Sequence, residues 1–113
     1  MIVKGVSRLS TRRTKMTIDK TNDGAKSTLK ITGRLDTATA PELEKAIAAL
    51  EADVKELVLD FAELEYISSA GLRVVLAAQK KMNTQGSMVI MNANESVMEV
   101  FEITGFADIV KLQ

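Results

Sequence analysis

Apolar and polar residues begin to alternate regularly at Met16. Residues 17–21 alternate weakly, and residues 27–35 place leucine and isoleucine side chains at every second position until Gly33 interrupts the pattern. An extended strand with one buried face has this period of two. The Asn-Asp-Gly sequence at 22–24 is a turn signal, so the two segments predict an antiparallel hairpin.

Two later segments are short and nearly continuous apolar runs, LVLDF at 57–61 and MVIM at 88–91. Strands that are buried on both faces have this composition, as parallel strands between helices do. Residues 109–112 predict one more short strand at an edge of the sheet. These runs therefore indicate two strands that are each buried on both faces.

Between these strands the apolar residues recur at helical spacing. The first helix is expected to begin at residues 36–42, where Thr39 and Glu42 fit the spacing of a capping box, and to end near 52–53. The third begins at 92–95 and ends at Gly105, which suits a left-handed cap. The predicted apolar stripes of the three helices are Leu43, Ile47 and Leu50, then Leu72, Val75, Leu76 and Met82, and finally Val97, Val100 and Phe101.

The predicted order of elements is therefore β-β-α-β-α-β-α-β. Alternating strands and helices imply right-handed crossovers between parallel strands. We expect a single α/β domain over residues 16–113, with a mixed, mostly parallel sheet of about four or five strands. Residues 1–15 are predicted to be a basic extension, flexible or non-native, because Met16 could begin a compact domain.

The segment 64–76 (LEYISSAGLRVVL) joins the third predicted strand to the second helix. Ser68 and Ser69 fall where that helix starts, and a serine there can accept a hydrogen bond from a backbone N–H that has no partner within the helix. The carboxyl ends of the strands in open α/β sheets usually carry the functional loops. We call residues 66–72 the serine corner and treat them as the candidate site.

Composition limits the chemistry available at this site. The chain has no histidine and no cysteine, so the commonest general base, the commonest metal ligand and the thiol nucleophile are all missing. There is also no glycine-rich phosphate cradle. We therefore expect a protein that is not an enzyme and that uses no cofactor or metal.

Charge and hydropathy limit its partners. Five of the 15 basic residues lie in residues 1–15, which contain no acid, so the rest of the chain has 10 basic and 15 acidic side chains and a net charge of −5. An acidic domain argues against nucleic acid as a partner. No apolar run has the length of a membrane span, so we expect a cytoplasmic protein that does not insert into membranes.

Three segments together resemble one family. They are GRLD at 33–36, YISSAGL at 66–72 after the apolar strand, and VF followed by GF between residues 100 and 106. This pattern resembles the anti-sigma factor antagonists, the stand-alone bacterial members of the STAS domain family (sulphate transporter and anti-sigma antagonist). The family motif is commonly Asp-Ser-Ser-Gly-Leu, and here its Asp falls on Ser68 and its second serine on Ala70.

The resemblance implies that Ser69 is the residue that a partner anti-sigma factor kinase phosphorylates, with Ser68 as the fallback. It implies a surface for that partner made by Asp36, Thr37, Ser68, Ser69, Gly71, Leu72 and Arg73. From the residues alone, Ser69 is a first-turn or capping serine, Gly71 permits close packing of helix on sheet, and Arg73 is an exposed helical side chain. Asp36 is equally well a turn residue, and Asp60 is best explained as an anchor for a loop.

The implied function is that of an anti-sigma factor antagonist. It would bind an anti-sigma factor with serine kinase activity, release a sigma factor, and be switched off by phosphorylation, with a phosphoserine phosphatase to reset it. We expect a monomer or weak dimer. Two alternatives remain open: a STAS scaffold or subunit of a stress-signalling or lipid-transport complex that works without phosphorylation, and an enzyme or small-ligand binder that uses Asp36, Asp60 and the serines.

Overall fold

The structure is a computed structural model that describes residues 6–9 and 16–113. Its strands are β1 Val6–Leu9, β2 Met16–Asp23, β3 Lys26–Leu35, β4 Glu56–Asp60, β5 Leu64–Ile67, β6 Ser87–Met91 and β7 Lys111–Leu112. Its helices are α1 Ala40–Ala48, α2 Ser69–Gln85 and α3 Glu95–Thr104, followed by the short 3-10 helix η1 Phe106–Asp108.

These strands form one sheet in the order β1-β2-β3-β4-β6-β7, with β5 also paired to β3. The first three are antiparallel neighbours, and every other pairing is parallel. The mixed, mostly parallel α/β sheet is therefore confirmed, and it has two strands more than expected. One is β1, which lies within the predicted extension. The other residues of that extension, 1–5 and 10–15, are outside the described part of the chain. The other is β5, which forms the start of the segment 64–76.

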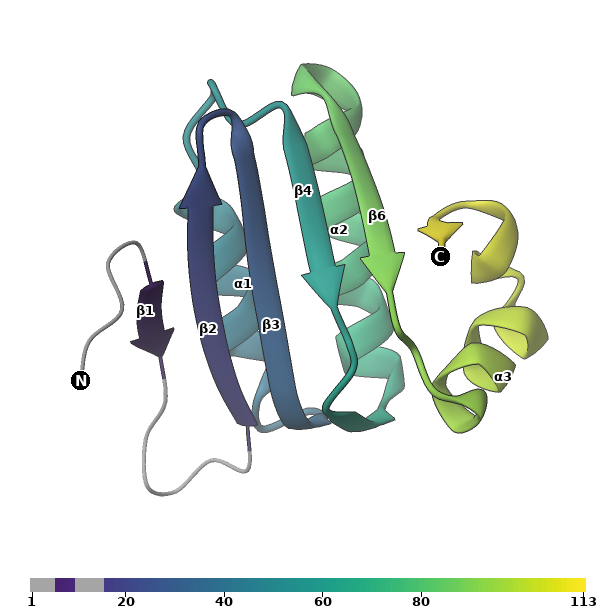
Figure 1. Ribbon diagram of the computed structural model, residues 1–113. Coiled ribbons are helices and arrows are strands. Elements are labelled where there is room, and N and C mark those ends of the chain that lie inside the picture. The colour runs from purple at the N-terminus through teal and green to yellow at the C-terminus, as the bar shows by residue number, and fades with distance from the viewer. Residues whose placement is uncertain (1–5, 10–15) are drawn as a thin grey trace.

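The helices α1 and α2 pack side by side on one face of the sheet, whereas no described helix covers the opposite face (Figure 1). Between helices and sheet lies a core of fully buried side chains that includes Leu29, Ile31, Leu59, Val75 and Met82. α3 lies beyond β6 and adds Val97 and Phe101 to this core. Most of the predicted apolar stripes are buried, and Leu76 and Val100 are partly exposed.

One edge of the sheet gathers the parts of the predicted site. The strands β3, β4 and β6 all end there, and α2 begins there, at the lower edge of Figure 1. β3 pairs with β4 through its first half and with β5 through its last residues, and the register shifts after Gly33, which has a φ of +103° that glycine adopts without steric cost. The serine corner was expected directly after the 57–61 strand. Its two serines instead follow β5, and the corner lies beside the end of β3.

The first helix ends at Ala48, so the predicted end near 52–53 is wrong. Leu50 and Val54 both turn into the core after the helix. The side-chain amide of Gln85, at the end of α2, donates to the carbonyls of Glu51 (2.9 Å) and Val54 (2.8 Å). These long-range hydrogen bonds fix the segment that follows α1 against the end of α2.

Candidate functional site

Ser68 and Ser69 occupy different positions at the start of α2. Ser68 is the N-cap residue, has extended backbone angles (φ −98°, ψ 175°), and its hydroxyl oxygen accepts from the N–H of Gly71 at 3.4 Å. Ser69 is the first helical residue, and it is exposed. Of the two serines, Ser68 therefore supplies the structural cap of α2. Ser69 is the more exposed of the two, since Ser68 is only partly exposed.

The backbone of the serine corner is held against the end of β3. The N–H of Ser68 donates to the carbonyl of Leu35 at 2.8 Å, and the N–H of Leu72 donates to the carbonyl of Ser68 at 2.9 Å. A Cβ on Gly71 would lie 2.7 Å from Cγ of Leu35 and 2.9 Å from Cγ1 of Ile67. The predicted role of Gly71 in close packing is therefore confirmed, and any side chain there would displace the corner.

The loop between β3 and α1 is built around Asp36 and Thr39. Atom Oδ1 of Asp36 accepts from the N–H groups of Ala38 (3.0 Å) and Thr39 (3.1 Å), as in an Asx turn. The Thr39 hydroxyl is buried, donates to the carbonyl of Arg34 at 2.7 Å, and accepts from the N–H of Asp36 at 2.9 Å. Thr39 is at the N-cap position of α1 but makes no side-chain cap, so the predicted capping box is wrong. Its hydroxyl ties the loop to the strand instead.

These contacts also affect the ionisation of Asp36. Burial acts to raise the pKa of its carboxyl group, but the hydrogen bonds from Thr39 and Ala38 and the nearby charge of Arg34 together outweigh burial and hold that pKa below its ordinary value of 3.8. Hydrogen bonds donated to a carboxylate stabilise its charged form. Asp36 is therefore an anion with a fixed orientation at neutral pH.

The predicted partner surface divides into an exposed and a buried part. Thr37, Ser69 and Arg73 are exposed, and Asp36 and Ser68 are partly exposed. Gly71 and Leu72 are buried, so they shape the corner and do not offer side chains to a partner. The hydrogen bond from Ser68 to Leu35 brings the two loops to one edge, since Asp36 directly follows Leu35.

Two exposed residues at this edge were missed by the sequence analysis. Arg34 lies opposite Tyr66 in the parallel register of β3 and β5, with its guanidinium carbon 4.5 Å from the centre of the tyrosine ring. Tyr66 is 42% exposed although it is a large aromatic residue. Its place just before the serines, as the one tyrosine of the chain, was the available signal. Its pairing with Arg34 depends on β5, which was not predicted.

Asp60 acts as a structural anchor, as expected. Its carboxylate accepts from the N–H of Ala62 at 3.0 Å and from the side-chain amide of Asn92 at 3.1 Å. It thereby joins the ends of β4 and β6. These bonds give it a role in the loops, and no second carboxylate forms a catalytic pair with it among the described contacts.

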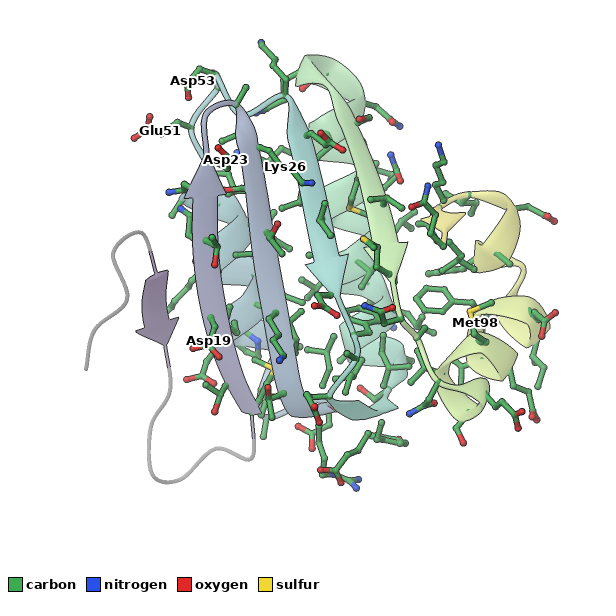
Figure 2. All side chains as sticks on the ribbon, in the orientation of Figure 1. Asp19, Asp23, Lys26, Glu51, Asp53 and Met98 are labelled. Carbon is green, nitrogen blue, oxygen red and sulfur yellow. The ribbon has the colours of Figure 1, made fainter. Side chains whose placement is uncertain are left out.

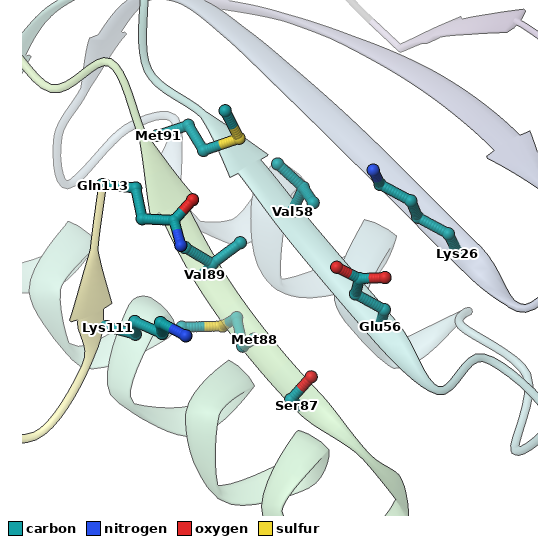
Figure 3. Close-up of a pocket in the computed structure, with 9 residues that line it drawn as sticks. All are labelled: Lys26, Glu56, Val58, Ser87, Met88, Val89, Met91, Lys111 and Gln113. Atoms are coloured by element: carbon teal, nitrogen blue, oxygen red, sulfur yellow. The ribbon is translucent and has the colours of Figure 1, made fainter.

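A hollow of about 270 Å³ lies on the sheet face that the helices leave open (Figure 3). Val58, Val89 and Met91 lie in it, with Lys26 on one side and Lys111 on the other. Figure 2 shows Lys26 at the hairpin end of β3, far along the strand from the serine corner. None of the predicted site residues lines this hollow.

The described residues contain no group of three or more histidine, cysteine, aspartate or glutamate side chains placed to hold a metal ion. Over the same residues, no helix combines the length and the apolar character needed to cross a membrane. The candidate site consists of an exposed serine at a helix start, an anchored aspartate and a stacked Arg–Tyr pair. Such a surface is suited to contact another protein, because the residues enriched at interfaces include tyrosine and arginine.

The arrangement of three helices on a mixed sheet is that of the STAS fold. An anti-sigma factor antagonist from Mycobacterium paratuberculosis has a solved structure that superposes with a TM-score of 0.79, at 27% identity over 92% of this chain and 89% of the other. Residues 17–113 match the STAS domain, and the chain belongs to the STAS domain family.

Sequence relatives carry names of the same kind. BtrV of Bordetella bronchiseptica, a protein named as an anti-sigma factor antagonist, is 41% identical over 97 residues, which cover 84% of this chain and 82% of BtrV. The anti-sigma-B factor antagonist of Listeria monocytogenes is 32% identical over 87 residues, covering 74% of this chain and 75% of that protein. The suspected relationship with anti-sigma factor antagonists is confirmed.

Proposed function

We propose that this protein is a cytoplasmic anti-sigma factor antagonist that is not itself an enzyme. It binds an anti-sigma factor with serine kinase activity, and this binding releases a sigma factor. Phosphorylation of Ser69 by that kinase ends the interaction. The observation that carries the proposal is the exposed Ser69 at the first position of α2, next to a Ser68 that already caps the helix, in a chain whose relatives are named for this function.

The position of Ser69 explains how the domain would tolerate a phosphate. Phosphorylation adds about −1.5 to −2 charges and three acceptor oxygens. The N-terminus of a helix favours negative charge, because its first N–H groups lack partners and the helix dipole is positive there. α2 has no acidic residue in its first turn, so no carboxylate of that turn repels the phosphate. The phosphate should therefore leave the fold intact.

The phosphate would then act on partner binding, at the interface between the serine corner and the anti-sigma factor. An exposed hydroxyl can be enclosed by a partner at little cost, whereas a dianion must lose its hydration shell and repels nearby acids on the partner. The buried Gly71 and the hydrogen bond from Ser68 to Leu35 hold the serine at a fixed place. A partner that fits the neutral corner would thus be excluded from the phosphorylated one.

The proposal is tested by affinity capture from a lysate of the bacterium that encodes the chain. The baits are wild type and Ser69→Glu, and the captured proteins are identified by mass spectrometry. We expect an anti-sigma factor of the kinase type on the wild-type bait and its loss from Ser69→Glu. Circular dichroism should show that both baits are folded.

Ser96→Glu is the matched control, because Ser96 is an exposed serine in the first turn of α3. It adds the same charge at the same kind of position, and it should retain the partner. Equal capture by wild type and Ser69→Glu would contradict the switch. Capture of a membrane or scaffold assembly by all three baits would favour the alternative of a STAS subunit that works without phosphorylation.

A further inference from the structure

The strongest feature outside the serines is the Arg34–Tyr66 pair. Residues opposite each other on neighbouring strands project to the same side of a sheet, and this register places the guanidinium group over the ring, at 4.5 Å from its centre. Both side chains remain accessible, since the Arg34 side chain is 45% exposed and Tyr66 is 42% exposed. A cation over a tyrosine face is attracted by the ring electrons. The ring therefore restricts the orientations of Arg34 before any partner arrives.

Among the residues that the structure describes, the side chain of Arg34 donates no hydrogen bond. An arginine has five N–H donors and no acceptor. It forms an ion pair with Asp36, in which the distance from Nε to Oδ2 is 3.8 Å, longer than a hydrogen bond. Asp36 meanwhile receives its hydrogen bonds from Ala38 and Thr39. Glu63 and Glu65 precede Tyr66 in sequence, and neither forms an ion pair with Arg34 in the described part of the chain.

We propose that Arg34, oriented by Tyr66, recognises a carboxylate on the protein that docks at the serine corner. This inference rests on the proposed function and assigns the chemistry of its partner. A planar guanidinium group binds a carboxylate through two parallel hydrogen bonds. Because Arg34 is already restricted by the ring, less side-chain entropy is lost when the partner binds.

The same contact accounts for the effect of phosphorylation. A partner that places a carboxylate at Arg34 carries negative charge at the edge where Ser69 lies. A phosphate on Ser69 repels that carboxylate, and the repulsion is strongest when water has been excluded from between them. Recognition by Arg34 and exclusion by phosphoserine would therefore depend on one acidic patch of the partner.

The test measures affinity between this protein and each anti-sigma factor of the kinase type from the same bacterium, purified and immobilised. Arg34→Glu should weaken binding by about tenfold or more, because it replaces attraction with repulsion. Arg34→Gln is a second variant, and it should weaken binding by several-fold and make the affinity less sensitive to salt. Tyr66→Phe keeps the ring and should bind like wild type, whereas Tyr66→Ala should bind less tightly.

Lys26→Glu is the matched control. Lys26 is an exposed cation on the same strand, at the hairpin end that Figure 2 shows far from the corner. It undergoes the same change of charge, and its effect should stay below about twofold, since a distant surface charge is screened by salt. A lysine scan of the partner's acidic residues should find one whose replacement restores binding to Arg34→Glu.

The outcomes separate this inference from the function on which it rests. If wild type binds an anti-sigma factor and Arg34→Glu and Arg34→Gln bind it equally well, the role of Arg34 is wrong and the proposed function stands. If wild type binds none of these proteins, the proposed function fails and the carboxylate contact fails with it. If Lys26→Glu weakens binding as much as Arg34→Glu, only net charge matters, and the specific contact is again wrong.

Discussion

Two corners of this molecule join a strand to a helix at the same edge of the sheet, and each has a hydroxyl residue at the N-cap position. At the start of α2, the oxygen of Ser68 accepts from the N–H of Gly71, the third residue of the helix. At the start of α1, the hydroxyl of Thr39 turns away from its helix and bonds to Arg34 and Asp36. Equivalent positions therefore serve different purposes.

The difference follows from the length of chain between strand and helix. β5 leads directly into α2 through Ser68, and the hydroxyl of Ser68 caps that helix. Four residues separate β3 from α1, and this loop has backbone groups that need partners. Thr39 is buried at 1% exposure, and its hydroxyl is the hydrogen-bond partner of the Arg34 carbonyl and of the Asp36 N–H. One corner thus presents a serine, and the other fixes an aspartate beside it.

The largest effect is expected from Gly71→Val, which would move the α2 corner away from the strand that supports it. A Cβ at this position meets Leu35 at 2.7 Å and also the backbone oxygen of Leu35 at 3.0 Å. We expect a loss of about 3 kcal/mol in the free energy of unfolding, measured with denaturant. Ala77→Val, on the exposed face of the same helix, should lose less than about 1 kcal/mol. Equal losses would mean that the corner has room to adjust.

The α1 corner is tested by Thr39→Val, which keeps the shape of the side chain and removes its hydroxyl. The carbonyl of Arg34 and the N–H of Asp36 would then lack their partner, so we expect a loss of about 2 kcal/mol. Thr39→Ser retains the hydroxyl and should lose about 1 kcal/mol or less. If the two variants were equally stable, the buried hydrogen bonds would contribute nothing, and the contrast between the corners would disappear.

These two positions also mark what the sequence could and could not predict. The alternation of residues 27–35 and the apolar runs at 57–61 and 88–91 correctly placed β3, β4 and β6, because burial on one or both faces leaves a pattern in the chain itself. Gly105 was correctly assigned as a left-handed cap, and its φ is +80°. The prediction of a capping box at Thr39 was wrong, because a local motif does not show whether the hydroxyl bonds to the N–H groups of its own helix or to the backbone of the preceding loop.

The missing elements have a common cause. β5 is only four residues long, and two contacts position it. It pairs with β3, and the side-chain amide of Asn94 donates to the carbonyl of Leu64 at 2.9 Å. The segment after α1 is held by Gln85 from another helix. Each of these contacts joins residues that are distant in sequence. Ser69 could be chosen from its motif, whereas Arg34 and Tyr66 required the register of β5.

Ser68→Ala and Ser69→Ala separate the two serines of the α2 corner. Loss of an N-cap side chain costs about 1 kcal/mol, and the 3.4 Å bond of Ser68 suggests a value at or below this. Ser69→Ala should leave the stability nearly unchanged, because alanine is favoured within a helix and the hydroxyl makes no capping bond. Thermal unfolding would compare them. A greater loss for Ser69→Ala would assign the cap to Ser69 and make Ser68 the better candidate for phosphorylation.

The smallest effect is expected at the α1 corner, in the pH dependence of Asp36. Its pKa is lower in the folded state than the ordinary value of 3.8, so the unfolded chain binds the proton first as pH falls. The stabilisation from the carboxylate is therefore complete above about pH 5 and is lost as the pH falls through 3.8 toward the folded-state pKa.

Asp36→Asn removes this titration and keeps an oxygen for the bonds from Ala38 and Thr39. Wild type should exceed Asp36→Asn in stability near pH 7 by less than about 1 kcal/mol, because solvent screens a partly exposed carboxylate, and the difference should shrink near pH 3. Denaturant unfolding at both pH values measures it. A gap that widened in acid would mean that the folded state raises the pKa of Asp36, and the anchored anion at this corner would be wrong.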